Sequence, residues 1–186
     1  MHFLGAVIGA ENEDGVEDIL ADWSEYADVD EYIAQTRDEI LSNGRAEDRD
    51  YLKHGKDMDA RKAAADRLAL DDKKALKAYA EYCGLTLNAN GDAVSTFNRD
   101  SFYDWYEIGG RWQSDVNGMQ GVTCHELLER YRQGDENVRH IIEDLCVICE
   151  QGWYDGGLWN DTETETVLAE LEQDADRKVW FVDFHD

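Results

Sequence analysis

The chain has 186 residues, of which 42% are hydrophobic and 11% aromatic, so it is long and apolar enough to form one well-buried domain. Its 43 acidic and 18 basic residues give a net charge of −25, which excludes direct binding to nucleic acids or anionic membranes, because phosphate binding requires clustered Lys and Arg. No apolar run reaches the ~20 residues of a membrane span, and the four cysteines are expected to be reduced thiols. We therefore expect a soluble, cytoplasmic protein.

The first predicted elements are a strand and two helices. Phe3–Ala10 is a continuous apolar run of eight residues, typical of a buried central strand. The apolar residues between Val16 and Trp23 recur at helical spacing. A second helix is predicted from Val29 to Ser42, and Asn43-Gly44 indicates its end.

The next stretch, Arg45–Cys83, is polar and rich in helix-forming residues, and we interpret it as a helical insertion at 45–83. Its segment Arg61–Ala80 has six Lys or Arg against three Asp, which is either a solvated helix face or a docking surface for an acidic partner. Leu85–Leu87 and Ala93–Phe97, joined through an Asn-Gly turn, predict a β-hairpin.

An aromatic block, Phe97–Trp112, follows the hairpin and ends in a diglycine and Arg111. One interpretation is structural: the glycines let the backbone reverse, the rings fill the core, and Arg111 pairs with Asp104 or Glu107. The other interpretation is a pocket for a planar or anionic small molecule. Its lining would be Trp105, Tyr106, Glu107, Arg111 and Trp112.

The C-terminal part alternates helices and loops before a last strand. Thr123-x-x-Glu126 is a capping-box signature that predicts a helix to Tyr131, and a further helix is predicted for Glu136–Gln151. Thr164–Glu172 is expected to be a short acidic helix, and Lys178–His185 a strand paired with the first one. Together these elements predict a single α+β domain over 1–186. Its sheet would have roughly four mainly antiparallel strands, with helices packed on one face.

Two groups of residues have the types that metal sites use. Cys146 and Cys149 have C-x-x-C spacing, but a zinc site would need a second ligand pair, and a position inside a helix favours buried core cysteines. Asp183 and His185 lie on one face of the last strand and could meet His2 at a facial metal site. Polar residues on the wet face of a terminal strand explain the same pattern, so we predict neither a metal nor a cofactor.

Acidic residues form two runs without any Lys or Arg: ten carboxylates between Glu11 and Gln35, and eleven between Ile141 and Asp176. Adaptation to high salt, mimicry of a polyanion, and simple solubility all explain such charge. The acidic surface that these runs predict for binding a partner consists of Glu11, Glu13, Asp14, Glu17, Asp18, Asp22, Glu25, Asp28, Asp30, Glu31, Asp161, Glu163, Glu165, Glu170 and Glu172.

The aromatic block also carries a resemblance. Residues 95–112, S-T-F-N-R-D-S-F-Y-D-W-Y-E-I-G-G-R-W, resemble a segment of small, uncharacterised phage and prophage proteins with the block N-x-x-S-x-x-D-W-Y-x-x-G-G-R-W. Val182–His185 is similar to their closing Val-Asp-Cys-His strand, with Phe184 where Cys is usual. The resemblance implies a phage or mobile-element origin and implies that the block is an element of the fold; it brings no activity with it.

Phage origin and uncompensated acidic runs lead to our first hypothesis, a non-enzymatic inhibitor of a host nucleic-acid-binding defence complex. Such an anti-CRISPR or anti-restriction protein would act as a DNA mimic on a host protein with a basic groove, in the host cytoplasm. Helical carboxylates recur every ~5 Å, against one charge per ~1.7 Å of duplex DNA, so mimicry requires both acidic runs on one face. The alternatives are a small-molecule-binding protein or enzyme that uses the aromatic Gly-Gly-Arg loop, and an ordinary domain from a salt-loving host.

Overall fold

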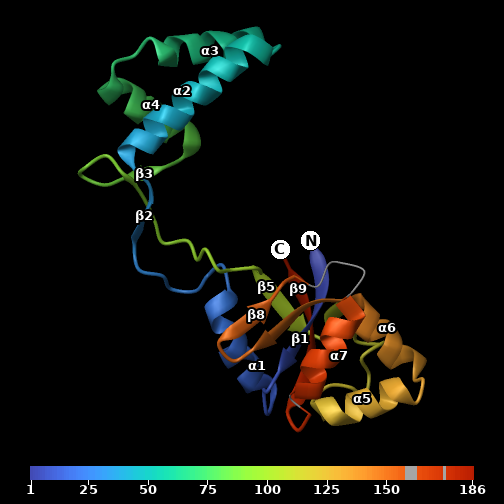
Figure 1. Cartoon of the computed structure of the whole chain (residues 1–186). Coiled ribbons are helices and arrows are strands. Elements are labelled where there is room, and N and C mark those ends of the chain that lie inside the picture. Colours follow the sequence, from blue (N-terminus) through green and yellow to red (C-terminus); the bar gives the residue numbers. More distant parts are fainter. Residues whose placement is uncertain (158–162, 174) are drawn as a thin grey trace. The chain divides into compact units, whose positions relative to one another are not determined.

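The computed structural model describes residues 1–157, 163–173 and 175–186. The chain forms two compact units, which are described separately (Figure 1). The first unit consists of Met1–Ala27 and Asn98–Asp186, and the second of Asp28–Phe97. The second unit covers more of the chain than the helical insertion expected at 45–83, and the added residues include three short strands. Within the described residues, no helix is both long and apolar enough to cross a bilayer.

The first unit is built on a six-stranded mixed sheet in the order β5-β9-β1-β7-β8, with β6 also paired to β9. The prediction of roughly four strands was therefore too low. Strand β1 pairs in parallel with β7, and every other pairing in this sheet is antiparallel. The bounds of the strands are β1 His2–Ile8, β5 Trp105–Ile108, β6 Val122–Thr123, β7 Leu145–Glu150, β8 Trp153–Asp155 and β9 Lys178–His185.

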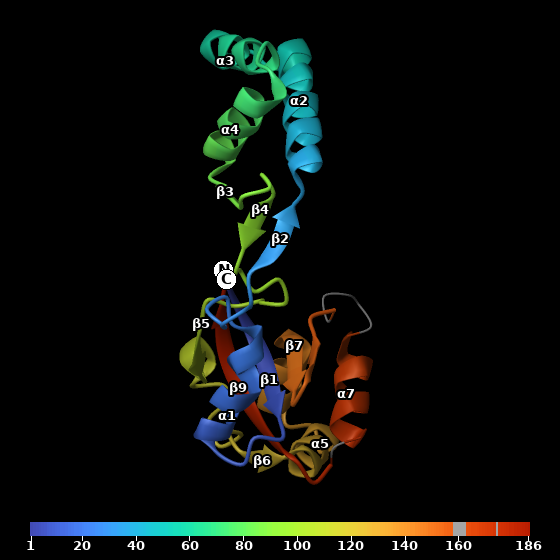
Figure 2. The same cartoon turned by 90° about the vertical axis from the view of Figure 1, so that its left-hand side faces the viewer.

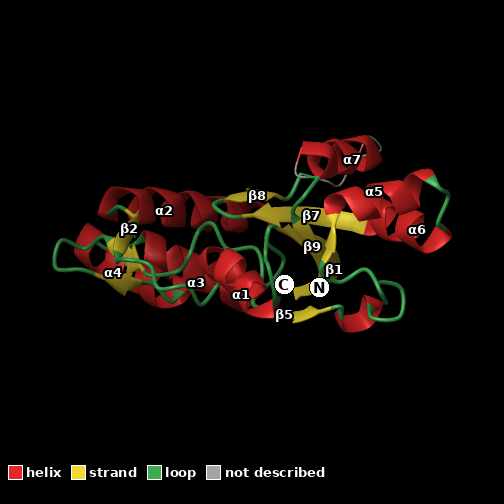
Figure 3. Ribbon diagram, turned by 90° about the horizontal axis from the view of Figure 1, so that it is seen from below, coloured by secondary structure: helices red, strands yellow, loops and turns green. Residues whose placement is uncertain are grey.

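Helices cover both faces of this sheet, so the prediction of helices on one face was wrong. Leu4, Ala6 and Ile8 of β1 pack under α5 (Cys124–Arg132), α6 (Glu136–Asp144) and α7 (Glu163–Gln173). Phe3 and Val7 point to the other face, where they pack against α1 (Glu13–Leu20). Figure 3 shows α5, α6 and α7 on one side of the sheet and α1 on the other. The apolar run of β1 requires cover on both sides, because successive side chains of a strand point to opposite faces.

The helix predicted for Glu136–Gln151 is half right. Helix α6 ends at Asp144, and Leu145 begins strand β7, which pairs with β1. The run Leu-Cys-Val-Ile-Cys is therefore a strand. Its hydrogen bonds come from β1, which lies far away in the sequence, so the local helical periodicity could not predict them. Cys149 is buried in the core, and burial raises the pKa of its thiol, so it is not a reactive thiolate.

The second unit contains three helices and a small antiparallel sheet in the order β2-β4-β3 (Figure 2). The hairpin predicted for 85–97 is confirmed, with Thr86–Leu87 paired to Ala93–Ser95. The helix predicted for Val29–Ser42 is wrong in its first half, because Tyr32–Gln35 forms strand β2 against β4. The bounds are β2 Tyr32–Gln35, α2 Arg37–His54, α3 Met58–Leu68, α4 Asp72–Cys83, β3 Thr86–Leu87 and β4 Ala93–Ser95.

Helix α2 begins and ends differently from the prediction. It begins with a capping box, in which Thr36 accepts the amide of Glu39 and the Glu39 carboxylate accepts the amide of Thr36. It also runs straight through Gly44, which was predicted as a stop. An ideal Cβ at Gly44 would lie 2.6 Å from the ring of Tyr79, so this glycine permits α4 to approach closely.

A buried polar network joins the three helices of the second unit. Asp48 of α2 accepts hydrogen bonds from Nε of Arg67 on α3 at 3.1 Å and from the hydroxyl of Tyr79 on α4 at 2.9 Å. Its other oxygen pairs with Nη2 of Arg67. The pKa of Tyr79 rises to about 12, first because of burial and then because of this hydrogen bond. The apolar core of the unit is small and centres on Ile40, Leu41, Ala75, Leu76, Tyr79 and Ala93.

Candidate functional site

A polar cluster interrupts the apolar face of the large sheet at the start of β1. Asp183 and His185 alternate with the core residues Val182 and Phe184 along β9, so they share a face, as predicted. The register places His185 between His2 of β1 and Trp105 of β5. We call His2, Asp104, Trp105, Arg111, Asp183 and His185 the histidine cluster.

Asp183 is the buried centre of the histidine cluster, with 2% of its surface exposed. Its Oδ1 lies 2.9 Å from Nδ1 of His2, and its Oδ2 accepts the backbone N–H of Arg111 at 3.0 Å. The Nε atom of Arg111 is 3.7 Å from the same Oδ2. A carboxylate only accepts hydrogen bonds, so it holds the proton of His2 on Nδ1 and leaves Nε2 as the free basic atom.

The second histidine is held in the same manner. Nδ1 of His185 lies 2.8 Å from Oδ1 of Asp104, and the ring of Trp105 stacks on His185 with centroids 5.1 Å apart. Lost hydration raises the pKa of Asp104, but the hydrogen bonds from His185 and from the Trp105 amide outweigh it and leave the pKa below its usual value. The two imidazole rings meet edge to face with centroids 4.9 Å apart. Two carboxylate-oriented histidines therefore lie side by side.

The diglycine brings the backbone onto Asp183. Gly109 donates its amide to the carbonyl of Phe181 at 2.9 Å, and Gly110 follows with φ +43°. An ideal Cβ at Gly110 would lie 2.3 Å from Cβ of Asp183. Only a glycine leaves room for the Arg111 amide to reach the carboxylate. Arg111 therefore pairs with Asp183, and the prediction that it pairs with Asp104 or Glu107 was wrong.

The five residues predicted to line a pocket do not all meet. Trp105 is 44% exposed, and Glu107 is exposed on the same face of β5. In the register of β5 and β9, Trp105 is paired with His185 and Glu107 with Asp183. Tyr106 points to the other face and packs against the core residues Tyr103 and Phe184. Trp112 packs against the core under the helices, 5.7 Å from the Arg111 guanidinium. Only Trp105, Glu107 and Arg111 therefore lie at the cluster.

The aromatic block and the last strand meet here. Asp104, Trp105, Gly110 and Arg111 come from the aromatic block, and Asp183 and His185 come from the closing strand. His2 was predicted to meet Asp183 and His185, and the structure brings these three side chains together, whereas Asp104 was not predicted to belong to any site. Strand alternation could place His2 beside His185, but no local signal could pair Asp104 with a residue 81 positions away.

The acidic residues are distributed over both faces of the large sheet and over both units. Glu13, Asp14, Glu17 and Asp18 are exposed on α1, and none of these four has an ion pair among the described residues. Helix α7, with Glu165, Glu170 and Glu172, covers the opposite face of the sheet, and Arg132 pairs with Glu172. The condition that both acidic runs share one face is therefore not met.

The remaining acidic positions fall into smaller groups. Glu11 pairs with Lys178 at 3.0 Å, whereas Asp22 and Glu25 follow α1 in the first unit. The second unit contains Asp28, Asp30 and Glu31. Asp161 and the side chain of Glu163 lie outside the described residues.

Neither metal coordination nor relatedness to known proteins supplies a further assignment. Among the described residues, no group of three or more His, Cys, Asp or Glu has a geometry that could hold a metal ion. No protein-family model matches the sequence, and no curated protein or solved structure matches it either. The chemistry of the histidine cluster is therefore inferred from its own geometry.

Proposed function

We propose that the histidine cluster binds a small molecule with an anionic group and a planar ring, which is the chemistry of a nucleotide. The observation that carries this proposal is the buried Asp183 carboxylate, which fixes His2 and the Arg111 backbone together. The guanidinium of Arg111 supplies donors for an anion, while Asp104 and Asp183 already hold the two histidines. Trp105 offers an exposed ring for stacking.

The same arrangement supports acid–base chemistry on the bound molecule. His2 and His185 each have Nδ1 held by a carboxylate, so the Nε2 atom of each ring is the one left to exchange a proton with a ligand. The two rings lie 4.9 Å apart between centroids, close enough to act together on one bound molecule. Such a pair suits hydrolysis or transfer at an anionic centre bound by Arg111.

Fluorescence and calorimetric titration with nucleoside mono-, di- and triphosphates, and with inorganic phosphate, test the proposal. We expect nucleotide binding to change tryptophan emission. Arg111→Ala should weaken nucleotide binding about ten-fold or more, because one charge-assisted hydrogen bond is lost. Arg139→Ala is the matched control, since the Arg139 guanidinium on α6 lies over the ring of Tyr131 on α5 and outside the histidine cluster. Absence of any response at millimolar concentrations, or an equal loss in both variants, contradicts the proposal.

A second candidate function rests on α1 alone. Its four unpaired carboxylates offer an anionic strip to a basic protein surface, and with the implied phage origin the partner would be a host nucleic-acid-binding defence complex. One helix gives a charge every ~5 Å, well below the density of a duplex, so this inhibitor would contact a basic patch rather than replace DNA along a groove.

Affinity capture from host lysate tests this second function. Reversal of Asp14 and Asp18 to Lys should abolish capture of a nuclease or CRISPR complex, whereas reversal of Glu165 and Glu170 on α7 should not. Capture of no nucleic-acid-binding protein, or equal capture by both reversed variants, speaks against it.

A further inference from the structure

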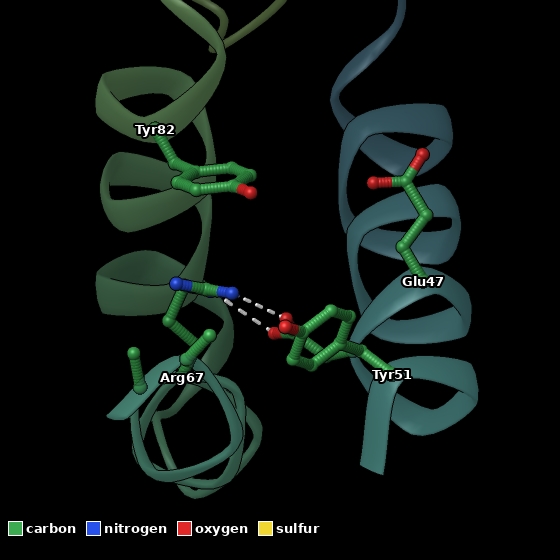
Figure 4. A pocket seen from close by; sticks show the side chains of 7 residues that line it. Glu47, Tyr51, Arg67 and Tyr82 are labelled. Atoms are coloured by element: carbon green, nitrogen blue, oxygen red, sulfur yellow. Dashed lines mark hydrogen bonds and ion pairs between the residues drawn. The ribbon is translucent and has the colours of Figure 1, made fainter. Parts of the chain in front are cut away.

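The second unit contains a cavity between its three helices that no role in the fold accounts for (Figure 4). Its volume is about 190 Å³, which is the size of one long side chain. Glu47 and Tyr51 of α2 line one wall, Arg67 and Tyr82 line the other, and the methyl groups of Ala60 and Ala63 on α3 complete it.

The positive charge in this cavity is already neutralised. Arg67 donates to both oxygens of Asp48, and its guanidinium lies 4.5 Å from the ring centroid of Tyr82. Asp48 also accepts the Tyr79 hydroxyl, so both of its oxygens are already hydrogen-bonded. The pair forms a neutral floor and gives an incoming group no net attraction.

Glu47 is the remaining charge of the cavity. It is exposed, lies one turn before Tyr51 on the same side of α2, and has no ion pair within the second unit, all of whose residues are described. Tyr51 and Tyr82 are 38% and 69% exposed, which is unusual for large rings that serve only the core. A single carboxylate beside two exposed tyrosine rings attracts a cation through charge and through the π faces.

We propose that this cavity receives the side chain of a lysine on a basic partner protein. The four-carbon stem of lysine matches the tyrosine rings and the alanine methyl groups, and its ammonium is a point charge that one carboxylate satisfies. The buried carboxylate of the cavity, Asp48, already pairs in a fork with Arg67, so the incoming side chain meets only the exposed Glu47. This site belongs to the second unit and does not depend on ligand binding at the histidine cluster.

The test is a titration of the full-length protein, followed by backbone amide NMR, with N-acetyl-lysine-N-methylamide as the probe. The matched probes are the norleucine and arginine analogues. We expect the lysine probe to shift the amides of Ala60, Ala63 and Tyr82, with the norleucine probe weaker and the arginine probe no tighter than lysine. Tight binding is not expected from one side chain, so affinity in the millimolar range is sufficient.

Variants separate the cavity from general attraction to an acidic protein. Glu47→Gln and Tyr82→Ala should each weaken lysine binding about three-fold or more, whereas Glu81→Gln, which removes the same charge from α4 outside the cavity, should leave it unchanged. Equal shifts with lysine and norleucine, tighter binding of the arginine probe, or equal weakening by Glu47→Gln and Glu81→Gln would overturn the proposal. Unchanged amide spectra outside the cavity confirm that each variant is folded.

Discussion

Among the described residues, each unit buries one aspartate, and the two aspartates have different roles. Asp48 is 4% exposed and is held by a guanidinium and a phenol that tie three helices together. Asp183 is 2% exposed, but its partner His2 keeps a quarter of its side chain in solvent. A buried carboxylate thus replaces missing apolar contacts in the second unit, whereas in the first it orients groups that a ligand can reach.

The difference follows from how much apolar surface each unit buries. The first unit has an apolar core on each face of its sheet. The second unit has one small apolar cluster, and the hydrogen bonds of Asp48 also join its three helices. Charge is also unequal: the first unit has 28 acidic and 7 basic residues, the second 15 and 11.

The largest expected effect is that of Asp48→Ala. It leaves Arg67 and Tyr79 without their buried partner, so the free energy of unfolding of the second unit should fall by about 3–5 kcal/mol. Hydrogen exchange followed by mass spectrometry should show loss of protection in α2, α3 and α4, while β1 and β9 stay protected. Asp66→Ala, at an exposed position of α3, is the control and should change stability by less than ~0.5 kcal/mol. Equal loss of protection in both units would contradict the comparison.

Gly110→Ala tests whether Asp183 depends on close backbone approach. The new Cβ collides with Asp183 and the left-handed backbone is strained, so we expect a loss of about 2–3 kcal/mol by urea denaturation. Gly118→Ala introduces the same backbone strain at φ +74°, with nothing within 4 Å of the new Cβ. It should therefore cost about 1 kcal/mol. Similar losses in the two variants would show that Asp183 tolerates displacement.

The stability of the two units should depend differently on salt concentration, because their net charges differ. The excess of acidic residues in the first unit is self-repulsive, and lowering the ionic strength from about 0.1 M to about 0.01 M lengthens the Debye length from ~10 Å to ~30 Å. Hydrogen exchange at the two salt concentrations should show a larger loss of protection in the first unit than in the second. Cooperative folding at about 0.1 M would also remove the interpretation of the charge as adaptation to a salt-loving host.

The smallest effect concerns one tyrosine in each unit at high pH. Burial, followed by the charge of Tyr106, raises the pKa of Tyr103 to about 12, and burial followed by the Asp48 hydrogen bond does the same for Tyr79. A phenol whose folded pKa is raised stabilises the fold below its unfolded pKa near 10, and this contribution is lost as the pH rises towards 12. Absorbance of tyrosinate should show late titrations that include these two phenols. Tyr79→Phe and Tyr103→Phe should each remove one of them, and an unchanged titration curve would contradict the assignment.

Much of the fold was predictable because its signals are local. The apolar run of β1, the helical spacing after Val16, the Asn-Gly hairpin and the strand Lys178–His185 were each predicted near their observed bounds. The wrong predictions of secondary structure concern strands whose pairing partner lies far away in the sequence. Strand β2 pairs with β4, and β7 pairs with β1. Both segments were predicted to be helical from their local pattern, but their hydrogen bonds to a distant strand make them strands.

For the site, the sequence by itself determined the face that Asp183 and His185 share, because alternation along a strand is a local property. It also determined that α1 carries carboxylates without counter-charge. Only the tertiary structure decided that Asp104 holds His185, that Gly110 lets Arg111 reach Asp183, and that α1 and α7 cover opposite faces of the sheet. Each of these depends on which strands become neighbours and on which face of the sheet each helix packs, and both join segments that lie far apart in the sequence.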